Sequence, residues 1–305
     1  KKIKFLNWLN NMEINYVKNN NTVLNINNKI DKLNVQWILE PYPHAIIDDF
    51  LPSEIFDKIS NSIADAYEIK DIKKIFTTEL EFNKKVYGLD ALEDQMKLPI
   101  QILGGLNMKK LFQKFIGNID VVSLNDFKSY GGYYPFHTMS ESGFLGSHVD
   151  HSNSKTGEVH MANSIYFVSK RWDKSLGGET ILFNNNGYEA QKFIDPKPNR
   201  LILFLHSSTT FHGVNVISKN SNFKRFSYYM DYYVDKKNIP ALKDNLKKKT
   251  FSAKYYSHPT IFLPFFPIGL KSFKFKSFFK IKTYYPYLYA YVKYLLNRYF
   301  LKRWA

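Results

Sequence analysis

Three side chains of the kind that binds metal ions lie in two short stretches of this sequence. His148 and Asp150 are two residues apart, and His212 follows Asp150 by 62 positions. Two imidazoles and one carboxylate are the set that holds Fe(II) on one face and leaves the opposite coordination positions open. These three residues therefore form a candidate iron site, with catalytic and metal-binding roles.

The spacing of two residues between His148 and Asp150 is also found between Arg225 and Ser227. In a β-strand, residues i and i+2 point to the same face, so one strand can supply both His148 and Asp150 to one ion. His212 must then come from a separate strand, which a barrel of two sheets can bring close. Arg225 and Ser227 are also two apart. A guanidinium fork beside a hydroxyl is suited to holding a carboxylate.

Two other residues compete for these roles. His206 is the rival of His212 for the second imidazole, and Lys224 is the rival of Arg225 for the carboxylate. Strand alternation favours Arg225, because it shares a face with Ser227 and Lys224 does not. A single histidine in a strand is more often structural than metal-binding, so the iron site depends on the joint pattern.

Composition limits the classes of protein that fit. The chain has 305 residues, of which 44% are hydrophobic and 17% aromatic, and this is enough for a substantial core. It contains no cysteine, which excludes disulfides, thiolate zinc sites and cysteine nucleophiles. The start lacks a signal-peptide pattern, and no apolar run has the length of a membrane span. We therefore expect a cytoplasmic protein that binds a membrane at most peripherally.

Positive charge is concentrated at the end of the sequence. The formal net charge is +16, and residues 236–305 contain sixteen Lys or Arg residues against one acidic residue, Asp244. The remaining body is nearly neutral, which disfavours a catalytic surface for nucleic acid. The basic extension is suited to a membrane surface or another anionic partner. A helix predicted for residues 286–304 could instead pack on the barrel or on a second copy, and the sequence leaves the oligomeric state open.

Hydrophobic patterning predicts a mainly β fold with flanking helices, of the α+β class. Helices are expected from Ser53 and over residues 90–115, with interruptions near Pro99 and at Gly104. Short strands with turns between them then predict two packed antiparallel sheets, a cupin-like jelly roll. The predicted strands are 121–127, 133–139, 144–148, 161–168, 179–183, 201–205, 212–217 and 226–234. The predicted division is an N-terminal cap (1–40), a jelly-roll domain (41–235) and a basic, aromatic extension (236–305).

The order of these motifs resembles the Fe(II)- and 2-oxoglutarate-dependent dioxygenases, particularly the prolyl-4-hydroxylase-like branch. The resemblance runs from about Tyr42 to Val234 and rests on residues 43–51, 143–150, 172–180 and 198–204. It implies a double-stranded β-helix with iron between its sheets. It also implies Fe(II), 2-oxoglutarate and O2 as cofactors, with ascorbate as an optional further one.

Residue roles follow from the same resemblance. His148, Asp150 and His212 would bind iron, Arg225 would pair with the distal carboxylate of 2-oxoglutarate, and Ser227 would hydrogen-bond to it. The implied reaction hydroxylates a substrate while 2-oxoglutarate is decarboxylated to succinate. The substrate class stays open between a peptidyl residue, an amino acid and a glycan, and its recognition is expected from residues 1–40 and 82–88.

One position departs from the family pattern. Some relatives place a tyrosine that contacts 2-oxoglutarate where this chain has Phe167. Asn163, on the same predicted strand face, is the expected substitute. The presence of Asp150 counts against the related halogenases. Two alternatives stay open, which are a non-catalytic barrel tethered by its extension to an anionic surface, and a nucleic-acid dealkylase.

Overall fold

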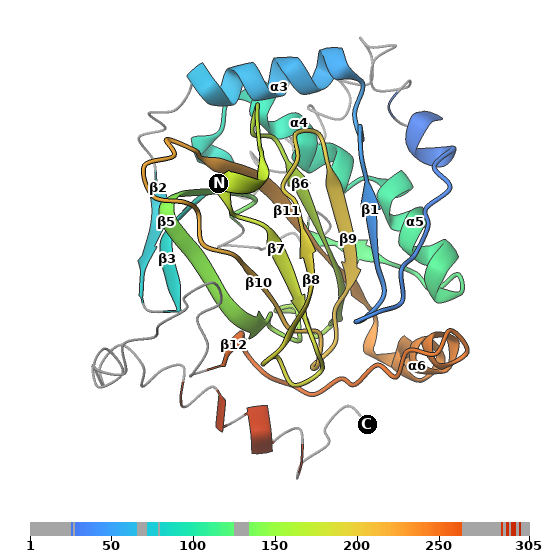
Figure 1. Cartoon of the computed structure of the whole chain (residues 1–305). Helices are drawn as coiled ribbons and strands as arrows, with labels where there is room; N and C mark the ends of the chain where they lie inside the picture. The colour runs from blue at the N-terminus through green and yellow to red at the C-terminus, as the bar shows by residue number, and fades with distance from the viewer. Residues whose placement is uncertain are drawn as a thin grey trace.

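The computed structural model describes residues 26, 28–65, 72–78, 80–124 and 134–263, together with residues 288, 291, 292, 294–296 and 299 (Figure 1). Most of the predicted N-terminal cap, part of the predicted strand 121–127 and part of the predicted C-terminal helix lie outside these residues.

A strongly curled antiparallel sheet forms the body of the protein. Its strands follow the order β1-β9-β6-β11-β5-β10-β7-β8 (Figure 1). In that order they are β1 (His44–Ile47), β9 (Leu201–Leu205), β6 (Val159–Phe167), β11 (Arg225–Val234), β5 (Phe136–Val149), β10 (His212–Val214), β7 (Thr180–Phe183) and β8 (Ala190–Ile194). This arrangement is a double-stranded β-helix and confirms the predicted fold class.

The long strand β5 joins the two halves of the sheet. Its first residues pair with β11 and its last residues with β10, where His148 lies opposite His212. Sequence patterning predicted two strands here, and the structure has one continuous strand with an irregularity. Opposite β3 (Glu81–Tyr87), β5 has three more residues than its partner between Met139 and Phe144. Against β10, β5 has one more residue than its partner between Leu145 and His148, and this odd shift changes which residues of β5 face inward on either side of it.

Three helices cover the outer face of the larger half of the sheet. They are α3 (Ser53–Asp65), α4 (Asp94–Leu103) and α5 (Leu106–Ile116). The pair Gly104–Gly105 separates α4 from α5, as the sequence predicted, and Pro99 lies inside α4. The ring of Phe112 packs 4.5 Å from that of Tyr232 in β11. Most of the buried apolar residues therefore lie between these helices and the sheet, which leaves the inner face of the sheet for polar residues.

Four further strands complete the sheet. They are β2 (Ile72–Thr77) and β3, which form a hairpin, and the short strands β4 (Val122–Ser123) and β12 (Ile261–Phe262). Neither strand of the β2–β3 hairpin was predicted from the sequence. The hairpin lies along β5 at the open end of the sheet (Figure 1).

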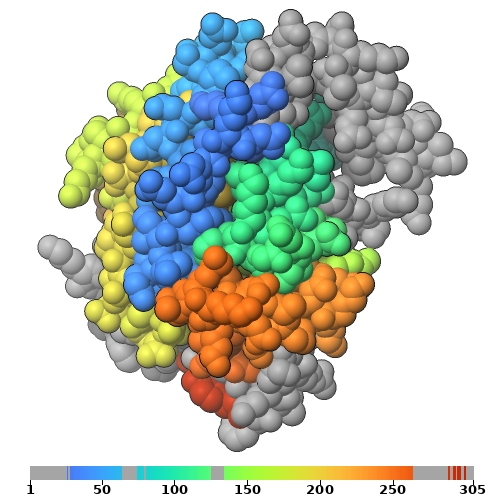
Figure 2. Space-filling model, turned by 90° about the vertical axis from the view of Figure 1, so that its right-hand side faces the viewer, coloured from blue at the N-terminus to red at the C-terminus, as the bar shows by residue number. Residues whose placement is uncertain are grey.

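The chain returns to the sheet after the oxygenase domain predicted from the sequence. Helix α6 (Ile239–Lys247) lies beside α5 and the N-terminal segment on one face of the molecule (Figure 2). Residues 251–263 then lead to β12, in which Phe262 lies opposite His148 of β5. Among the described residues, no helix is long and apolar enough to cross a membrane.

Candidate active site

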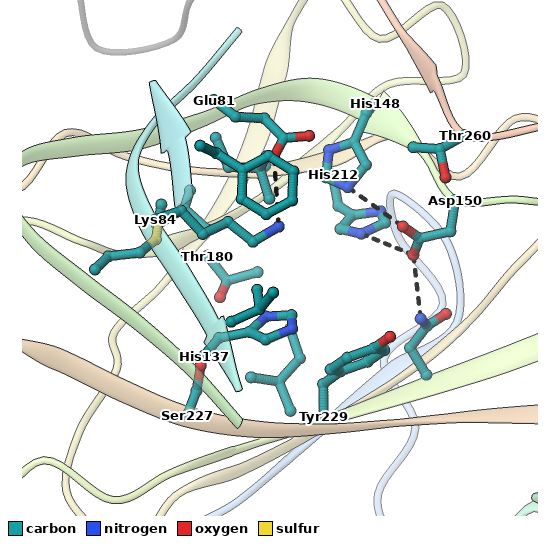
Figure 3. A pocket seen from close by; sticks show the side chains of 18 of the residues that line it. Glu81, Lys84, His137, His148, Asp150, Thr180, His212, Ser227, Tyr229 and Thr260 are labelled. Carbon is teal, nitrogen blue, oxygen red and sulfur yellow. Dashed lines mark hydrogen bonds and ion pairs between the residues drawn. The ribbon is translucent and has the colours of Figure 1, made fainter. Parts of the chain in front are cut away.

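A cavity of about 420 Å³ lies between the two halves of the curled sheet. Strand β11 lines it with every second residue, namely Arg225, Ser227, Tyr229 and Asp231. The residues between them, Phe226, Tyr228 and Met230, face the opposite side, as the alternation of a strand requires. The two halves of β5, the hairpin strand β3, and strands β10 and β12 contribute further walls (Figure 3).

The three predicted metal ligands meet on one wall of this cavity. Nε2 of His148 lies 3.5 Å from Oδ1 of Asp150, and Nε2 of His212 lies 3.3 Å from Oδ2 of the same carboxylate. Figure 3 shows all three side chains directed toward one another. The structure thus brings together residues that are 62 positions apart in the sequence.

The backbone determines which nitrogen of each imidazole faces the cavity. Nδ1 of His148 lies 2.9 Å from the carbonyl oxygen of Gly146, and Nδ1 of His212 lies 3.4 Å from that of Thr210. An N–H at Nδ1 donates to that carbonyl and leaves a lone pair at Nε2. Both lone pairs therefore point toward Asp150, as a metal site requires.

The charges of the site also suit a cation. Burial lowers the pKa of His212, and the neighbouring His148 lowers it further, so its imidazole is neutral. Burial alone would raise the pKa of Asp150, but His212 and His148 hold it well below its ordinary value. His212 thus offers a neutral nitrogen and Asp150 an ionised carboxylate, the protonation states in which these groups bind a metal.

Arg225 forms a second polar centre in the same cavity. Its guanidinium is buried and donates hydrogen bonds to the carbonyl of Gly178, the hydroxyl of Ser227 and the hydroxyl of Thr180, at 3.0, 3.1 and 3.2 Å. The ring of Phe167 lies 4.8 Å from its central carbon. No described acidic side chain pairs with it. Burial lowers the pKa of Arg225 to about 9, which leaves it charged at neutral pH.

Two glycines shape the turn that supplies one of these acceptors. Gly177 has φ +69°, and a Cβ atom there would lie 2.1 Å from the carbonyl oxygen of Val216. Only glycine fits this position without a backbone shift. The turn places the carbonyl of Gly178 and the hydroxyl of Thr180 against the guanidinium. Two of the three hydrogen bonds donated by Arg225 therefore depend on this turn.

Three residues of this end of the cavity were not identified from the sequence. Thr180 lies within a stretch that carries the family resemblance, so that stretch was the available signal. His137 lies opposite Ser227, and burial, Lys84 and Arg225 together lower its pKa well below the ordinary value. Lys84 reaches into the cavity from β3, where its ammonium lies 3.8 Å from Glu81 (Figure 3). The charged sequence of β3 gave no strand signal from which Lys84 could have been found.

Asn163 lies in the cavity wall, but its contacts differ from the expected ones. Its side-chain nitrogen donates to Oδ2 of Asp150 at 3.1 Å and to Oδ1 of Asp231 at 2.9 Å. The amide therefore holds the metal-binding carboxylate. Phe167, where some relatives have a tyrosine, packs against Arg225 and has no polar group to offer.

Neither rival residue lies in the cavity wall. The imidazole nitrogens of His206 lie 3.1 and 3.2 Å from the carbonyl oxygens of His160 and Asp150, so His206 contacts the backbone of the site. Lys224 is half-buried outside the cavity. Arg225, and not Lys224, thus lines the cavity, on the strand face that it shares with Ser227.

Comparison with known proteins agrees with this geometry. Residues 134–230 match the model of the 2OG-Fe(II) oxygenase superfamily. A prolyl hydroxylase from Trichoplax adhaerens, solved with a peptide fragment of hypoxia inducible factor, is 17% identical; the match covers 72% of this chain and 95% of that one, with a TM-score of 0.50. A prolyl-4-hydroxylase from Pseudomonas putida is 14% identical over 69% and 98% of the two chains, with a TM-score of 0.47. No curated protein matches by sequence.

The fold and the site together define a class and then a family. A double-stranded β-helix with two histidines and one aspartate between its sheets defines an iron-binding jelly-roll oxygenase. Residues 134–230 match the 2OG-Fe(II) oxygenase superfamily, so this part of the chain is a domain of that superfamily, with a fold like that of the Trichoplax adhaerens prolyl hydroxylase. The predicted family, enzyme class and cofactors Fe(II), 2-oxoglutarate and O2 are therefore confirmed.

Proposed function

We propose that this enzyme hydroxylates a C–H bond of a substrate that enters the cavity between the two halves of the sheet. His148, Asp150 and His212 would hold Fe(II), and Arg225 with Ser227 and Thr180 would hold the distal carboxylate of 2-oxoglutarate. Bound iron and 2-oxoglutarate supply the oxidising chemistry when O2 reacts, with succinate as co-product. The protein binds and orients the reactants and excludes water from them.

The observation that carries this proposal is the buried Arg225 in the same cavity as the three metal ligands. A buried guanidinium without an anion is costly, and a bidentate carboxylate is the ligand that relieves the cost best. 2-Oxoglutarate has a carboxylate for the guanidinium at one end and a 2-oxo acid for the metal at the other. The remaining volume suits a single side chain or a small molecule.

The substrate stays within the predicted classes of a peptidyl residue, an amino acid and a glycan. Its contacts are expected from the β2–β3 hairpin, because Lys74, Phe76, Glu81 and Lys84 all line the cavity. The stretch 82–88, named from the sequence as a candidate for substrate recognition, contains most of β3.

Anaerobic titration with 2-oxoglutarate tests the proposal. After Fe(II) is added, 2-oxoglutarate should produce a weak visible charge-transfer band in the wild-type protein, and succinate should form in air. Arg225→Ala should raise the 2-oxoglutarate concentration for half-maximal absorbance by about thirtyfold or more, because losing one partner of a buried charged pair costs about 2–5 kcal/mol.

Lys224→Ala is the matched control. It removes the adjacent cation, which lies outside the cavity, and should leave the titration unchanged. The absence of both the band and succinate in the wild-type protein would favour the alternative of a non-catalytic binding barrel. Binding of oligonucleotides that persists without residues 236–305 would favour a nucleic-acid dealkylase.

A further inference from the structure

The C-terminal helical residues dock on the barrel through one side. Residues 288, 291, 292 and 294–296 are helical. Tyr294 is 1% exposed, and its hydroxyl donates to the carbonyl oxygen of Ser208 at 2.6 Å. Its ring meets those of His258 and Phe211 edge-on, at centroid distances of 5.3 and 6.3 Å. These contacts determine which side of the helix faces the protein.

The opposite side carries a row of exposed apolar residues. Leu288, Val292 and Leu296 are 50%, 47% and 47% exposed. They recur every four residues, so they lie one above another on the helix. We call these three residues the apolar stripe. A single exposed leucine is ordinary, but a helix that is apolar on both sides is not stable at a water-facing surface. The stripe therefore calls for an apolar partner.

Exposed lysines lie at the same end of the molecule. The orange helix α6 and the red C-terminal residues both lie at the lower end in Figures 1 and 2. Six exposed lysines belong to α6 or to the residues beside it, namely Lys236, Lys237, Lys247, Lys248, Lys249 and Lys254. Residues 236–305 contain sixteen basic residues and one acidic residue, Asp244, and the preceding Asp235 pairs with Lys237 at 3.2 Å. An apolar row with cations beside it matches the headgroup region of an anionic bilayer.

We propose that the apolar stripe and these six lysines bind the surface of a membrane that contains anionic lipid. The stripe lies among the headgroups and upper acyl chains, and the lysines meet lipid phosphates and carboxylates. A symmetric dimer through the stripe is less favourable than membrane binding, because an isologous interface brings the same basic surface of each copy together and the two surfaces repel each other.

Membrane attachment would place the catalytic cavity close to the lipid surface. Tyr294 packs against His258, and the chain continues from His258 through Thr260 to Phe262. Thr260 and Phe262 line the cavity, and the ring of Phe262 stacks on that of His148 at 5.0 Å. A short segment thus joins the docked helix to the wall of the metal site. This inference does not depend on the identity of the substrate.

Co-sedimentation with vesicles tests the proposal on the full chain. Vesicles of phosphatidylcholine with phosphatidylserine should bind the protein, and vesicles of phosphatidylcholine alone should bind it far more weakly. The variant Leu288→Ser/Val292→Ser/Leu296→Ser should lose about tenfold or more in affinity, because its stripe no longer enters the apolar layer. Lys247→Glu/Lys248→Glu should also weaken binding, and raised salt should weaken wild-type binding.

The matched control replaces three exposed apolar residues elsewhere. Ile75, Leu106 and Phe193 are 52%, 63% and 51% exposed, and their triple serine variant should bind vesicles as the wild type does. The proposal is overturned if the wild-type protein does not sediment with phosphatidylserine vesicles, or if the stripe variant binds as tightly as this control. It is also overturned if the wild type is a dimer in sedimentation velocity and the stripe variant a monomer.

Discussion

Two groups of two histidines and one aspartate lie side by side in this barrel. One is His148, Asp150 and His212, and the other is His151, His160 and Asp231. In each group the three ligand atoms lie within 4.8 Å of one another. Asn163 joins the groups, because its nitrogen donates to both carboxylates. By residue type alone, either group is a candidate for iron.

The groups differ in where their nitrogens point. In the second group, Nδ1 and Nε2 of His160 lie 2.9 and 3.1 Å from the carbonyl oxygens of His151 and Ala162, so both face backbone acceptors. Nε2 of His151 lies 2.8 Å from the hydroxyl of Tyr233. The rings of His151 and His160 are stacked at an interplanar angle of 29°, so their in-plane lone pairs lie in nearly parallel planes. In the first group, both Nε2 atoms are directed at Asp150.

The difference teaches that composition does not define a metal site. A ligand nitrogen must keep its lone pair and aim it at the point where the others converge, and the hydrogen bond at the second nitrogen decides this. The first group meets that condition, and the second is a hydrogen-bonded support for it. The following predictions test this contrast, from the largest effect to the smallest.

Removing one histidine from each group should have different effects on metal binding. His212→Ala should weaken Co(II) or Fe(II) binding by more than about a hundredfold, since even outer partners of metal ligands contribute 10–100-fold. His151→Ala should still bind one metal ion per chain. Stoichiometry from Co(II) absorbance titration separates the two cases. Two ions per wild-type chain, with one lost in His151→Ala, would show that the second group is itself a metal site.

The link between the groups should have an intermediate effect. Asn163→Leu removes the hydrogen bond that holds Asp150 and should weaken metal binding by about tenfold to a hundredfold. The metal's absorption spectrum should also change, because the carboxylate is free to turn. Ser164→Ala, at the adjacent residue whose hydroxyl lies 3.1 Å from that of Tyr232, is the control, and it should leave the spectrum unchanged. If Asn163→Leu instead weakens only the binding of 2-oxoglutarate, the role expected from the sequence is correct.

The smallest effect is on the stability of the metal-free protein. Burial, followed by the influence of His151, lowers the pKa of His160 to about 3. As the pH falls, His160 takes up a proton in the unfolded chain near the ordinary histidine pKa, but it does not do so in the folded chain. The free energy of unfolding therefore falls as the pH falls. His160 should account for about 1 kcal/mol of the loss between about pH 7.5 and about pH 5.5.

Urea denaturation at the two pH values measures this loss. His160→Asn should reduce the pH-dependent part by about 1 kcal/mol, whatever its effect on stability at about pH 7.5. An unchanged pH dependence would mean that His160 takes up its proton in the folded protein, where it would form an ion pair with Asp231.

Much of the site followed from strand alternation. The shared face of His148 and Asp150, and that of Arg225 and Ser227, needs only the local two-residue period. The order of the motifs predicted the double-stranded β-helix and the oxygenase class. These features depend on residues close in sequence, or on a motif order read directly from the chain.

Tertiary structure decided the features that join distant segments. The register shift of β5 against β10 changes its inward face between Leu145 and His148, so His137 and His148 both line the cavity although their positions differ in parity. The tertiary structure also placed Lys84 of the β2–β3 hairpin and Phe262 of β12 in the cavity wall. Strand alternation placed Asn163 on the strand face that lines the cavity. Its hydrogen bond to Asp231, however, depends on the pairing of β6 with β11.

The sequence by itself thus determined which residue types were available and which strand face each would occupy. Only the tertiary structure decided which of the two His/His/Asp groups directs its nitrogens at one point. That choice depends on backbone carbonyls at Gly146, Thr210 and Ala162, which carry no side-chain signal in the sequence. The tertiary structure also decided that the C-terminal helix docks through Tyr294 and leaves its apolar stripe exposed, because the packing partner of a helix face lies elsewhere in the chain.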